Sequence, residues 1–258
     1  MDLGLSGKTA LVTGGSKGIG LACAELLANE GCRVAITSRG AANLEAAKKR
    51  LKECFAHAAD LTSPDAAAGM IDAVEREIGP IDILVNSAGA AKRTPPDELD
   101  PIAWRAAMDA KFFTYIHAID PLIKRMAARA HGVIVNVIGN GGKIASATHI
   151  AGGAANAALM LATAGLANAY ASRGVRVVGV NPGLTKTDRV EEGLRAEARL
   201  SGASPEESLK RALARIPLGR MAEPDEIARV VCFLASSQAS YVSGVTITMD
   251  GVSAPLVV

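Results

Sequence analysis

Short runs of β-branched and other apolar residues alternate along the chain with longer Ala- and Leu-rich stretches, and this alternation constrains the fold most. Within each run, apolar residues occupy odd and even positions alike, which is typical of strands buried on both faces of a parallel sheet. The longer stretches have helical character and carry the chain back for the next parallel strand. We therefore expect an α/β protein, a doubly wound parallel sheet of about seven strands with helices on both faces. The expected strands are residues 9–13, 33–38, 57–61, 81–86, 132–138, 175–180 and 245–249.

The chain has 258 residues, a length that one α/β domain fills with a single core. It contains no internal repeat and no low-complexity linker, so we expect one domain over residues 1–258. Residues 185–215 interrupt the rhythm of strands and helices with a charged segment that follows the sixth expected strand. Ligands of doubly wound sheets bind outside the carboxyl ends of the strands. The segment is therefore predicted to be a lid over the substrate.

A glycine-rich turn joins the first expected strand to the first expected helix, where residues 13–20 read TGGSKGIG. Its glycines at 14, 18 and 20 permit a tight turn and a close approach of the backbone to a ligand. The N–H groups and positive dipole end of the following helix suit a pyrophosphate. This placement predicts a Rossmann-type dinucleotide site, and a sharp turn without any ligand is the alternative.

The end of the second expected strand bears on the choice of dinucleotide. Folds that select NAD place a carboxylate here to bind the ribose 2′-hydroxyl. This chain instead reads Thr37-Ser38-Arg39, and Lys17 lies in the glycine turn. Two cations and no acid at this corner suit a 2′-phosphate, which favours NADP(H) over NAD(H). The alternative is that Arg39 is an ordinary surface residue.

Together with several later motifs, these residues resemble the short-chain dehydrogenase/reductase family almost from end to end. The later motifs are DL at 60–61, NSAG at 86–89, NPG at 181–183 followed by two threonines, and a C-terminal signature over 217–251. The resemblance implies hydride transfer between a nicotinamide cofactor and a small-molecule substrate. It also implies a set of cofactor-lining residues: Gly14, Ser16, Lys17, Gly18, Ile19, Gly20, Arg39, Asp60, Leu61, Asn86, Ala88, Gly89, Pro182, Gly183, Thr185 and Thr187.

The same resemblance implies a catalytic tetrad of Asn, Ser, Tyr and Lys, and the chain departs from it at every position. The aligned positions hold Lys111, Gly139, Gly152 and Asn156. In the family, the tyrosine exchanges a proton with the substrate oxygen, and the lysine lowers the pKa of the tyrosine. Loss of one such acid–base group lowers a rate by about 10²–10⁴-fold. The catalytic residues are therefore unknown from the sequence.

Two nearby residues are candidate substitutes for the missing groups. His149 is a candidate general acid, because an unperturbed histidine changes charge between about pH 5 and 8, and a solvated loop histidine is the alternative. Lys143 is the other candidate, with a surface role or a contact to a substrate anion as the alternative. Lys111, Asn140 and Ser146 also fall in segments that border the family's site.

Three functions stay open at this point. The first is an NADP(H)-dependent oxidoreductase with a non-standard active site. The second is a catalytically silent subunit, or an NADP(H)-binding regulator, that partners an active enzyme. The third is lyase or isomerase chemistry on the same fold.

Composition narrows the partners and the location. The net charge of +2 is too small to indicate an electrostatic field that would attract nucleic acid. Four cysteines without paired or metal-ligand spacing predict free thiols, a reducing cytoplasm and no metal. Residues 1–8 are no signal peptide, and the Ala-rich run at 154–169 looks too short and too polar to span a bilayer. We expect a cytoplasmic homodimer or homotetramer that pairs through residues 152–172 and 225–236, or a hetero-oligomer with an active relative.

Overall fold

The computed structural model describes residues 2–51, 53–188, 190, 193, 194, 198 and 202–256. Its centre is a seven-stranded sheet in the order β3-β2-β1-β4-β5-β6-β7, in which every neighbouring pair is parallel. The strands are β1 (Thr9–Thr13), β2 (Arg33–Ser38), β3 (Phe55–Ala58), β4 (Ile83–Asn86), β5 (Gly132–Val137), β6 (Val175–Pro182) and β7 (Thr246–Met249). The winding reverses between β1 and β4, and this is where doubly wound sheets open a crevice for ligands. The predicted Rossmann-type architecture is confirmed.

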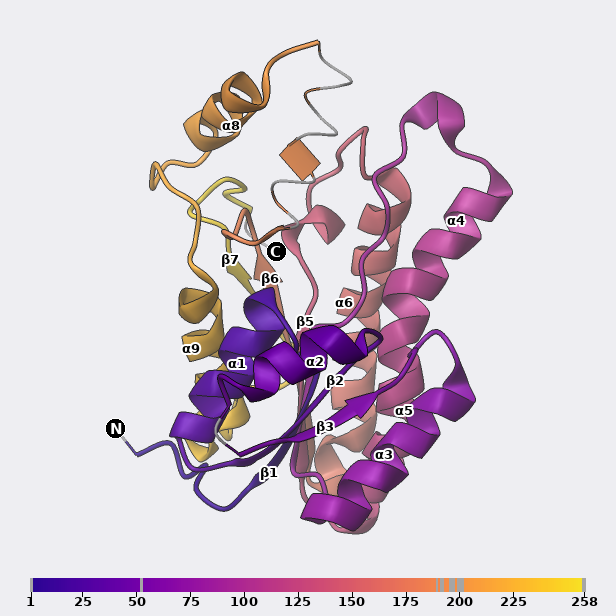
Figure 1. Cartoon of the computed structure of the whole chain (residues 1–258), viewed down its shortest axis with the longest axis vertical. Coiled ribbons are helices and arrows are strands. Elements are labelled where there is room, and N and C mark those ends of the chain that lie inside the picture. Colours follow the sequence, from indigo (N-terminus) through magenta and orange to yellow (C-terminus); the bar gives the residue numbers. More distant parts are fainter. Residues whose placement is uncertain are drawn as a thin grey trace.

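Helices cover both faces of the sheet (Figure 1). Helices α1, α2 and α9 pack on one face through Leu27, Leu44 and Val231, and helices α3, α5 and α6 cover the other. The helices are α1 (Gly18–Asn29), α2 (Ala41–Lys48), α3 (Pro64–Ile78), α4 (Pro101–Met108), α5 (Thr114–Ala128), α6 (Ile150–Tyr170), α8 (Pro205–Ala214) and α9 (Pro224–Ala235). A π-helical turn, η2 (Asp109–Phe113), joins α4 to α5, and a short 3-10 turn, η3 (Asn140–Gly142), follows β5.

The sequence located β1 and β2 to the residue, but β3 lies earlier than predicted. It spans Phe55–Ala58 rather than residues 57–61, in register with Ala35–Ser38 of β2. As an edge strand it is only partly buried, so its apolar pattern is weaker than that of a central strand. The strand at the other edge, β7, is likewise only half-buried. Burial on both faces thus holds for the inner strands and fails at the two edges.

A buried polar network links the inner strands. The Thr13 hydroxyl donates to Asn86 Oδ1 at 3.3 Å, and Asn86 Nδ2 donates to Asn136 Oδ1 at 3.0 Å. Asn136 Nδ2 in turn donates to the hydroxyl of Thr163 on α6, at 3.0 Å. All four residues are at least 99% buried. Because buried polar groups need partners, this network fixes β1, β4, β5 and α6 in one arrangement.

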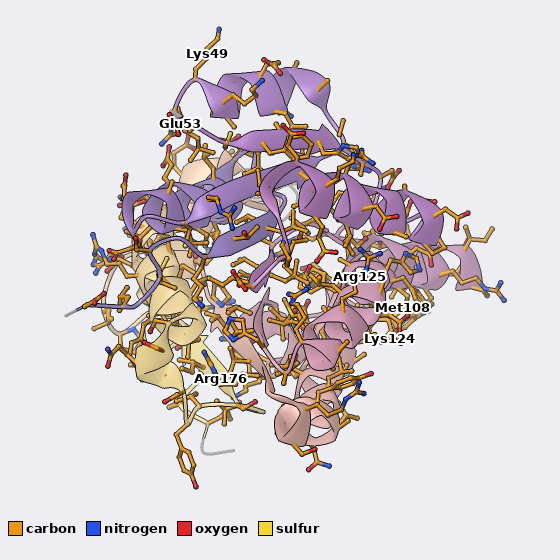
Figure 2. All side chains as sticks on the ribbon, turned by 90° about the horizontal axis from the view of Figure 1, so that it is seen from below. Lys49, Glu53, Met108, Lys124, Arg125 and Arg176 are labelled. Carbon is orange, nitrogen blue, oxygen red and sulfur yellow. The ribbon has the colours of Figure 1, made fainter. Side chains whose placement is uncertain are left out.

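Charged side chains lie at the amino ends of the strands, on the side of the molecule opposite the carboxyl ends. Arg125 of α5 pairs with Glu75 of α3 at 2.7 Å, and Arg176 of β6 donates to the carbonyls of Ser236 and Val242 at 3.0 and 3.1 Å. Figure 2 views the molecule from below and shows Arg125 and Arg176 on different sides of it. Arg125 thus joins α5 to α3, and Arg176 joins β6 to the end of α9 and to the loop before β7.

Helix α6 corrects the expectation that the Ala-rich run at 154–169 is too short and too polar to span a bilayer. The segment Ile150–Arg173 contains an 18-residue window with a mean hydropathy of 1.5, so it is long and apolar enough to cross a membrane by length and composition alone. In this fold one face of it packs on the sheet through Leu159 and Ala167, as a core helix does. The prediction of a cytoplasmic protein therefore stays a prediction from the sequence.

The predicted lid is described only in part. Residues 185–188, 190, 193, 194, 198 and 202–215 are described and include α8, whereas residues 189, 191, 192, 195–197 and 199–201 lie outside the described residues. Figure 1 shows α8 at one end of the molecule. Its role as a lid stays a prediction, as does the single domain.

Candidate functional site

The carboxyl edge of the sheet gathers the residues that the sequence assigned to a cofactor. The glycine turn follows β1, Arg39 follows β2, and Asp60 follows β3. The NSAG and NPG motifs begin within the last residues of β4 and β6. Because all the strands are parallel, these segments meet along one edge, centred on the point where the winding reverses.

The glycine turn is held as a bare backbone cradle. Gly14 and Gly18 have φ angles of +67° and +56°, in the left-handed region that favours glycine. A Cβ on Gly20 would lie 2.3 Å from the carbonyl oxygen of Gly14, so no side chain fits there without moving the turn. The N-cap of α1 is Lys17, which makes no side-chain cap hydrogen bond. The helix N-terminus can therefore receive an anion, and the cradle fits the pyrophosphate of a dinucleotide.

Neighbouring segments fix the position of this cradle. The N–H groups of Gly14 and Gly15 donate to the Thr37 carbonyl at 2.8 and 3.3 Å, and a Cβ on Gly14 would lie 2.8 Å from the nitrogen of Ala88. The methyl group of Thr187, which follows β6, would lie 3.3 Å from a Cβ on Gly18. The structure thus brings the β1, β4 and β6 loops into contact.

Thr13 is a site residue that the sequence analysis passed over. Besides its bond to Asn86, its hydroxyl accepts from the N–H groups of Ser87 and Ala88 at 3.1 and 3.2 Å. This side chain ties the glycine turn to the NSAG segment. Its place as the first letter of the TGGSKGIG motif was the available signal.

The charges beside β2 differ in part from the expectation. Lys17 and Arg39 are exposed, and within the described residues neither forms an ion pair or a side-chain hydrogen bond. The corner is not free of acid, however, because Asp60 follows the adjacent strand. The backbone N–H and hydroxyl of Thr62 hold the pKa of Asp60 below its ordinary value, and the nearby positive charge of Arg39 acts in the same direction. The sequence named Asp60 as a cofactor-lining residue, but the prediction of a corner without an acid considered only the end of β2 and did not place this carboxylate beside Arg39.

Two of the predicted cofactor residues have buried side chains with other partners. Asn86 belongs to the polar network described above, and Leu61 is 97% buried in the core. The Leu61 carbonyl also lies 2.9 Å from Nδ1 of His117. Contact of either residue with a cofactor would come from its backbone, and it stays a prediction.

Lys111 points into the protein rather than toward solvent. It lies on the π-helical turn and is 93% buried, with its ammonium donating to the hydroxyl of Tyr115 at 2.9 Å and to the Val137 carbonyl at 3.2 Å. The Tyr115 hydroxyl donates to the same carbonyl. The ammonium lies 4.5 Å from the centre of the tyrosine ring, which adds a cation–π contact. Lys111 and Tyr115 therefore fasten η2 and α5 to the end of β5.

His149 lies at the N-cap of α6, directly against Gly152. A Cβ on Gly152 would be 2.1 Å from Cε1 of this imidazole and 2.6 Å from Nε2, so the ring occupies the space in which a side chain at 152 would begin. A Cβ on Gly141 would lie 3.1 Å from Cδ2 of the same ring. The imidazole is thus enclosed between η3 and the first turn of α6, and its residue is half-buried.

Asn156 completes this cluster one turn further along α6. Its Nδ2 lies 3.3 Å from a Cβ built on Gly139 and 3.5 Å from one built on Gly141. Asn156 is 95% buried, and its Oδ1 has no hydrogen-bond partner among the described residues. Buried polar atoms normally have partners, so this amide is suited to a ligand or an ordered water. Lys143 is half-buried at the end of η3.

Comparison with known proteins places this geometry in a family. A profile of the family described as "Enoyl-(Acyl carrier protein) reductase" matches residues 14–251. The acetoacetyl-CoA reductase of Shinella zoogloeoides is 36% identical over 250 residues, which cover 95% of this chain and 97% of that protein. A 3-oxoacyl-[acyl-carrier-protein] reductase of Vibrio cholerae is 33% identical and covers 96% and 98%.

Solved structures agree with these relatives. A single-residue variant of the actinorhodin polyketide ketoreductase with NADPH superposes with a TM-score of 0.92 at 29% identity, over 95% of this chain and 96% of that one. The L-sorbose reductase of Gluconobacter frateurii, complexed with NADPH and L-sorbose, has a TM-score of 0.89 at 28% identity and covers 97% and 98%. The chain therefore belongs to the short-chain dehydrogenase/reductase family of oxidoreductases.

Proposed function

We propose that this protein binds NADP(H) at the carboxyl edge of its sheet and uses it to interconvert a small-molecule carbonyl and its alcohol. The observation that carries the proposal is the backbone cradle at Gly14–Gly20. A side chain at position 20 would collide with the Gly14 carbonyl, so the cradle requires glycine there. NADPH complexes of two similar structures and the carbonyl-reducing names of two relatives support it. When bound, the cofactor supplies the hydride, and the chain supplies binding, orientation and proton transfer.

The preference for NADP(H) over NAD(H) is part of the proposal. Arg39 and Lys17 are exposed cations without other side-chain bonds in the described part of the chain, and they flank the corner where a ribose phosphate would lie. Asp60 occupies the same corner, but its carboxylate is already engaged by the N–H and hydroxyl of Thr62. A guanidinium–phosphate contact contributes about 1.5–3 kcal/mol, which corresponds to a tenfold to hundredfold change in affinity.

A titration of NADPH and NADH by fluorescence tests this proposal. Arg39→Asp is expected to weaken NADPH binding by about tenfold to hundredfold and to leave NADH binding within about threefold. Arg173→Asp is the matched control, because Arg173 lies at the far end of α6, just before β6 begins. A wild-type protein that is folded but binds neither dinucleotide would refute the proposed function. Equal loss of NADPH affinity in both variants would refute only the assigned corner.

We also propose that the active site is non-standard, with Lys111, Gly139, Gly152 and Asn156 at the positions of the family tetrad. The two glycines leave no side chain beside β5 and α6 at these points, while Lys111 is occupied with Tyr115. A catalytically silent NADP(H)-binding subunit is the alternative function, favoured by these replacements. Turnover separates the two, because a silent subunit binds NADPH and oxidises it with none of a panel of diketones, β-ketoesters and enones.

The expected pairing of subunits is likewise a proposal. Leu161 on α6 is 76% exposed, and Trp104 on α4 and Phe113 on η2 are 38% and 40% exposed on elements that contact α6. Trp104 and Phe113 also line a hollow of about 470 Å³. Large exposed apolar side chains on neighbouring elements are typical of an interface. We expect a dimer or tetramer in light scattering and its dissociation by Leu161→Glu.

A further inference from the structure

Five residues from the end of β5 and the start of α6 converge at the carboxyl ends of the strands, where the cofactor is proposed to bind. Gly139 and Gly141 lie at η3, His149 is the N-cap of α6, and Gly152 and Asn156 lie on its first two turns. The distances given above place the His149 ring and the Asn156 amide around Gly141, both within van der Waals contact of a Cβ built there. The imidazole and the amide therefore border one small volume.

The position of the ring is informative because of where it lies relative to Gly152. A side chain leaves the backbone along its Cα–Cβ bond, and here three ring atoms lie within 2.7 Å of that Cβ point. The imidazole thus occupies the direction in which a residue at 152 would reach toward a substrate. Glycine is the residue that leaves this space to the ring.

We propose that the imidazole of His149 delivers the proton to the substrate oxygen, in the place that a tyrosine at position 152 would have. This inference rests on the proposed function. As hydride reaches the carbonyl carbon, the N–H bond at Nε2 of the protonated His149 imidazolium breaks, an O–H bond forms on the carbonyl oxygen, and a neutral imidazole is left. The imidazole then regains a proton from solvent. Nε2 is assigned because Nδ1 is buried. The Asn156 amide, beside the ring, is placed to hold the same oxygen.

The surrounding glycines are consistent with this role. An imidazole that starts at the N-cap reaches less far than a tyrosine hydroxyl would from position 152, so the substrate oxygen has to approach the helix more closely. A Cβ at Gly139 would meet only Asn156 within 4 Å, among the described residues, so this wall is open to a substrate. The substrate class that fits is a reactive carbonyl with a small substituent on one side, such as an α-diketone or a β-ketoester.

The first test does not depend on turnover. NMR resolves the Cε1–H signals of the chain's four histidines, and loss of one signal in His149→Ala assigns it. We expect saturating NADP⁺ to shift the His149 signal and to leave that of His131 unchanged. His131 lies at the opposite edge of the sheet, 3.4 Å from Asp82. A stationary His149 signal, with shifted amides in the glycine turn, overturns this inference alone. The absence of any shift overturns the proposed function as well.

The second test measures NADPH oxidation with 2,3-butanedione and ethyl acetoacetate. His149→Ala is expected to lower kcat by about 10²-fold or more, to leave the Kd for NADPH within twofold, and to recover activity with added imidazole. His131→Ala, the matched control, should keep the wild-type kcat and show no response to imidazole. An unchanged kcat in His149→Ala, or a loss that imidazole does not restore, overturns the inference. A wild-type protein that binds NADPH and reduces neither substrate overturns it together with the proposed reductase activity.

Discussion

The contact between Gly20 and Gly14 makes the glycine turn open to a quantitative test. In Gly20→Ala the new methyl carbon would lie 2.3 Å from the Gly14 oxygen, 2.8 Å from its carbonyl carbon and 3.2 Å from the nitrogen of Gly15. Non-bonded heavy atoms prefer separations of about 3.5 Å, so the turn has to open by about 1 Å. Overpacking of this kind costs about 1–3 kcal/mol. These neighbours are backbone atoms, which cannot rotate away as a side-chain end can.

The free protein can relieve this strain by opening the turn, but binding has to restore the closed cradle. The strain should therefore appear mainly in the dissociation constant, as a loss of NADPH affinity of about fivefold to hundredfold. Any strain that the free turn retains lowers Tm instead, by about 2–4 °C per kcal/mol for a chain of this size. A fluorescence titration and a thermal melt together should account for the full free energy of overpacking in Gly20→Ala.

Gly69→Ala is the matched control for the chemistry of the substitution. Gly69 lies within α3, and a Cβ there would meet no heavy atom within 4 Å beyond the neighbouring backbone of its own helix. Alanine at an open helical position should stabilise the fold by about 1 kcal/mol through helix propensity, with NADPH affinity unchanged. A Gly20→Ala variant that keeps both the wild-type Tm and the wild-type Kd would contradict the predicted strain, because the contact then costs nothing.

Three further predictions concern stability and reactivity. Gly152→Ala should lower stability by about 1–3 kcal/mol through its contact with His149, and adding His149→Ala to the same chain should restore most of the loss. Thermal unfolding of the single and double variants in which the two stability changes simply add would contradict this contact. Tyr115→Phe should lower the free energy of unfolding by about 1–2 kcal/mol, because it removes the buried hydroxyl that accepts from Lys111 and donates to the Val137 carbonyl. Tyr241→Phe, at an exposed position, is the control and should leave Tm unchanged. Thiol titration at pH 8 should find Cys54 first and the other three thiols only after unfolding, because burial raises the pKa of all four but leaves Cys54 partly accessible to the reagent. A second thiol that reacts fast in the folded protein would contradict this prediction. Burial raises the pKa of Cys32 to about 11, that of Cys232 to about 12, and that of Cys23 well above its ordinary value.

Patterns along the chain predicted the sheet well because burial and periodicity are local signals. The β1 and β2 strands are continuous apolar runs between clear boundaries, and their ends were located to the residue. The glycine turn was equally readable, since its φ angles and close contacts admit few residues other than glycine. The edge strand β3 was placed less well, because partial burial weakens the pattern that marks a strand.

The contents of the site were harder to predict because they depend on contacts between distant segments. No local pattern shows that Asp60 lies within electrostatic range of Arg39, or that the Lys111 ammonium turns inward to the end of β5. The relation between His149 and Gly152 was nearer in sequence but still hidden. A sequence shows a histidine three residues before a glycine, and only the N-cap conformation brings the ring onto the Cβ position.

This last contact changes how the missing tyrosine should be understood. A tyrosine placed at position 152 would begin inside the His149 ring, so restoring Tyr and Lys at 152 and 156 alone would force the imidazole out of its place. The two arrangements exclude each other: either a side chain starts at 152 or the histidine occupies that direction. The glycine at 152 is then a requirement of the present site rather than only the loss of a catalytic group. A restored tyrosine should function only in a chain that also lacks the His149 side chain, and improved carbonyl reduction by Gly152→Tyr/Asn156→Lys with His149 intact would show that the ring moves more freely than this packing implies.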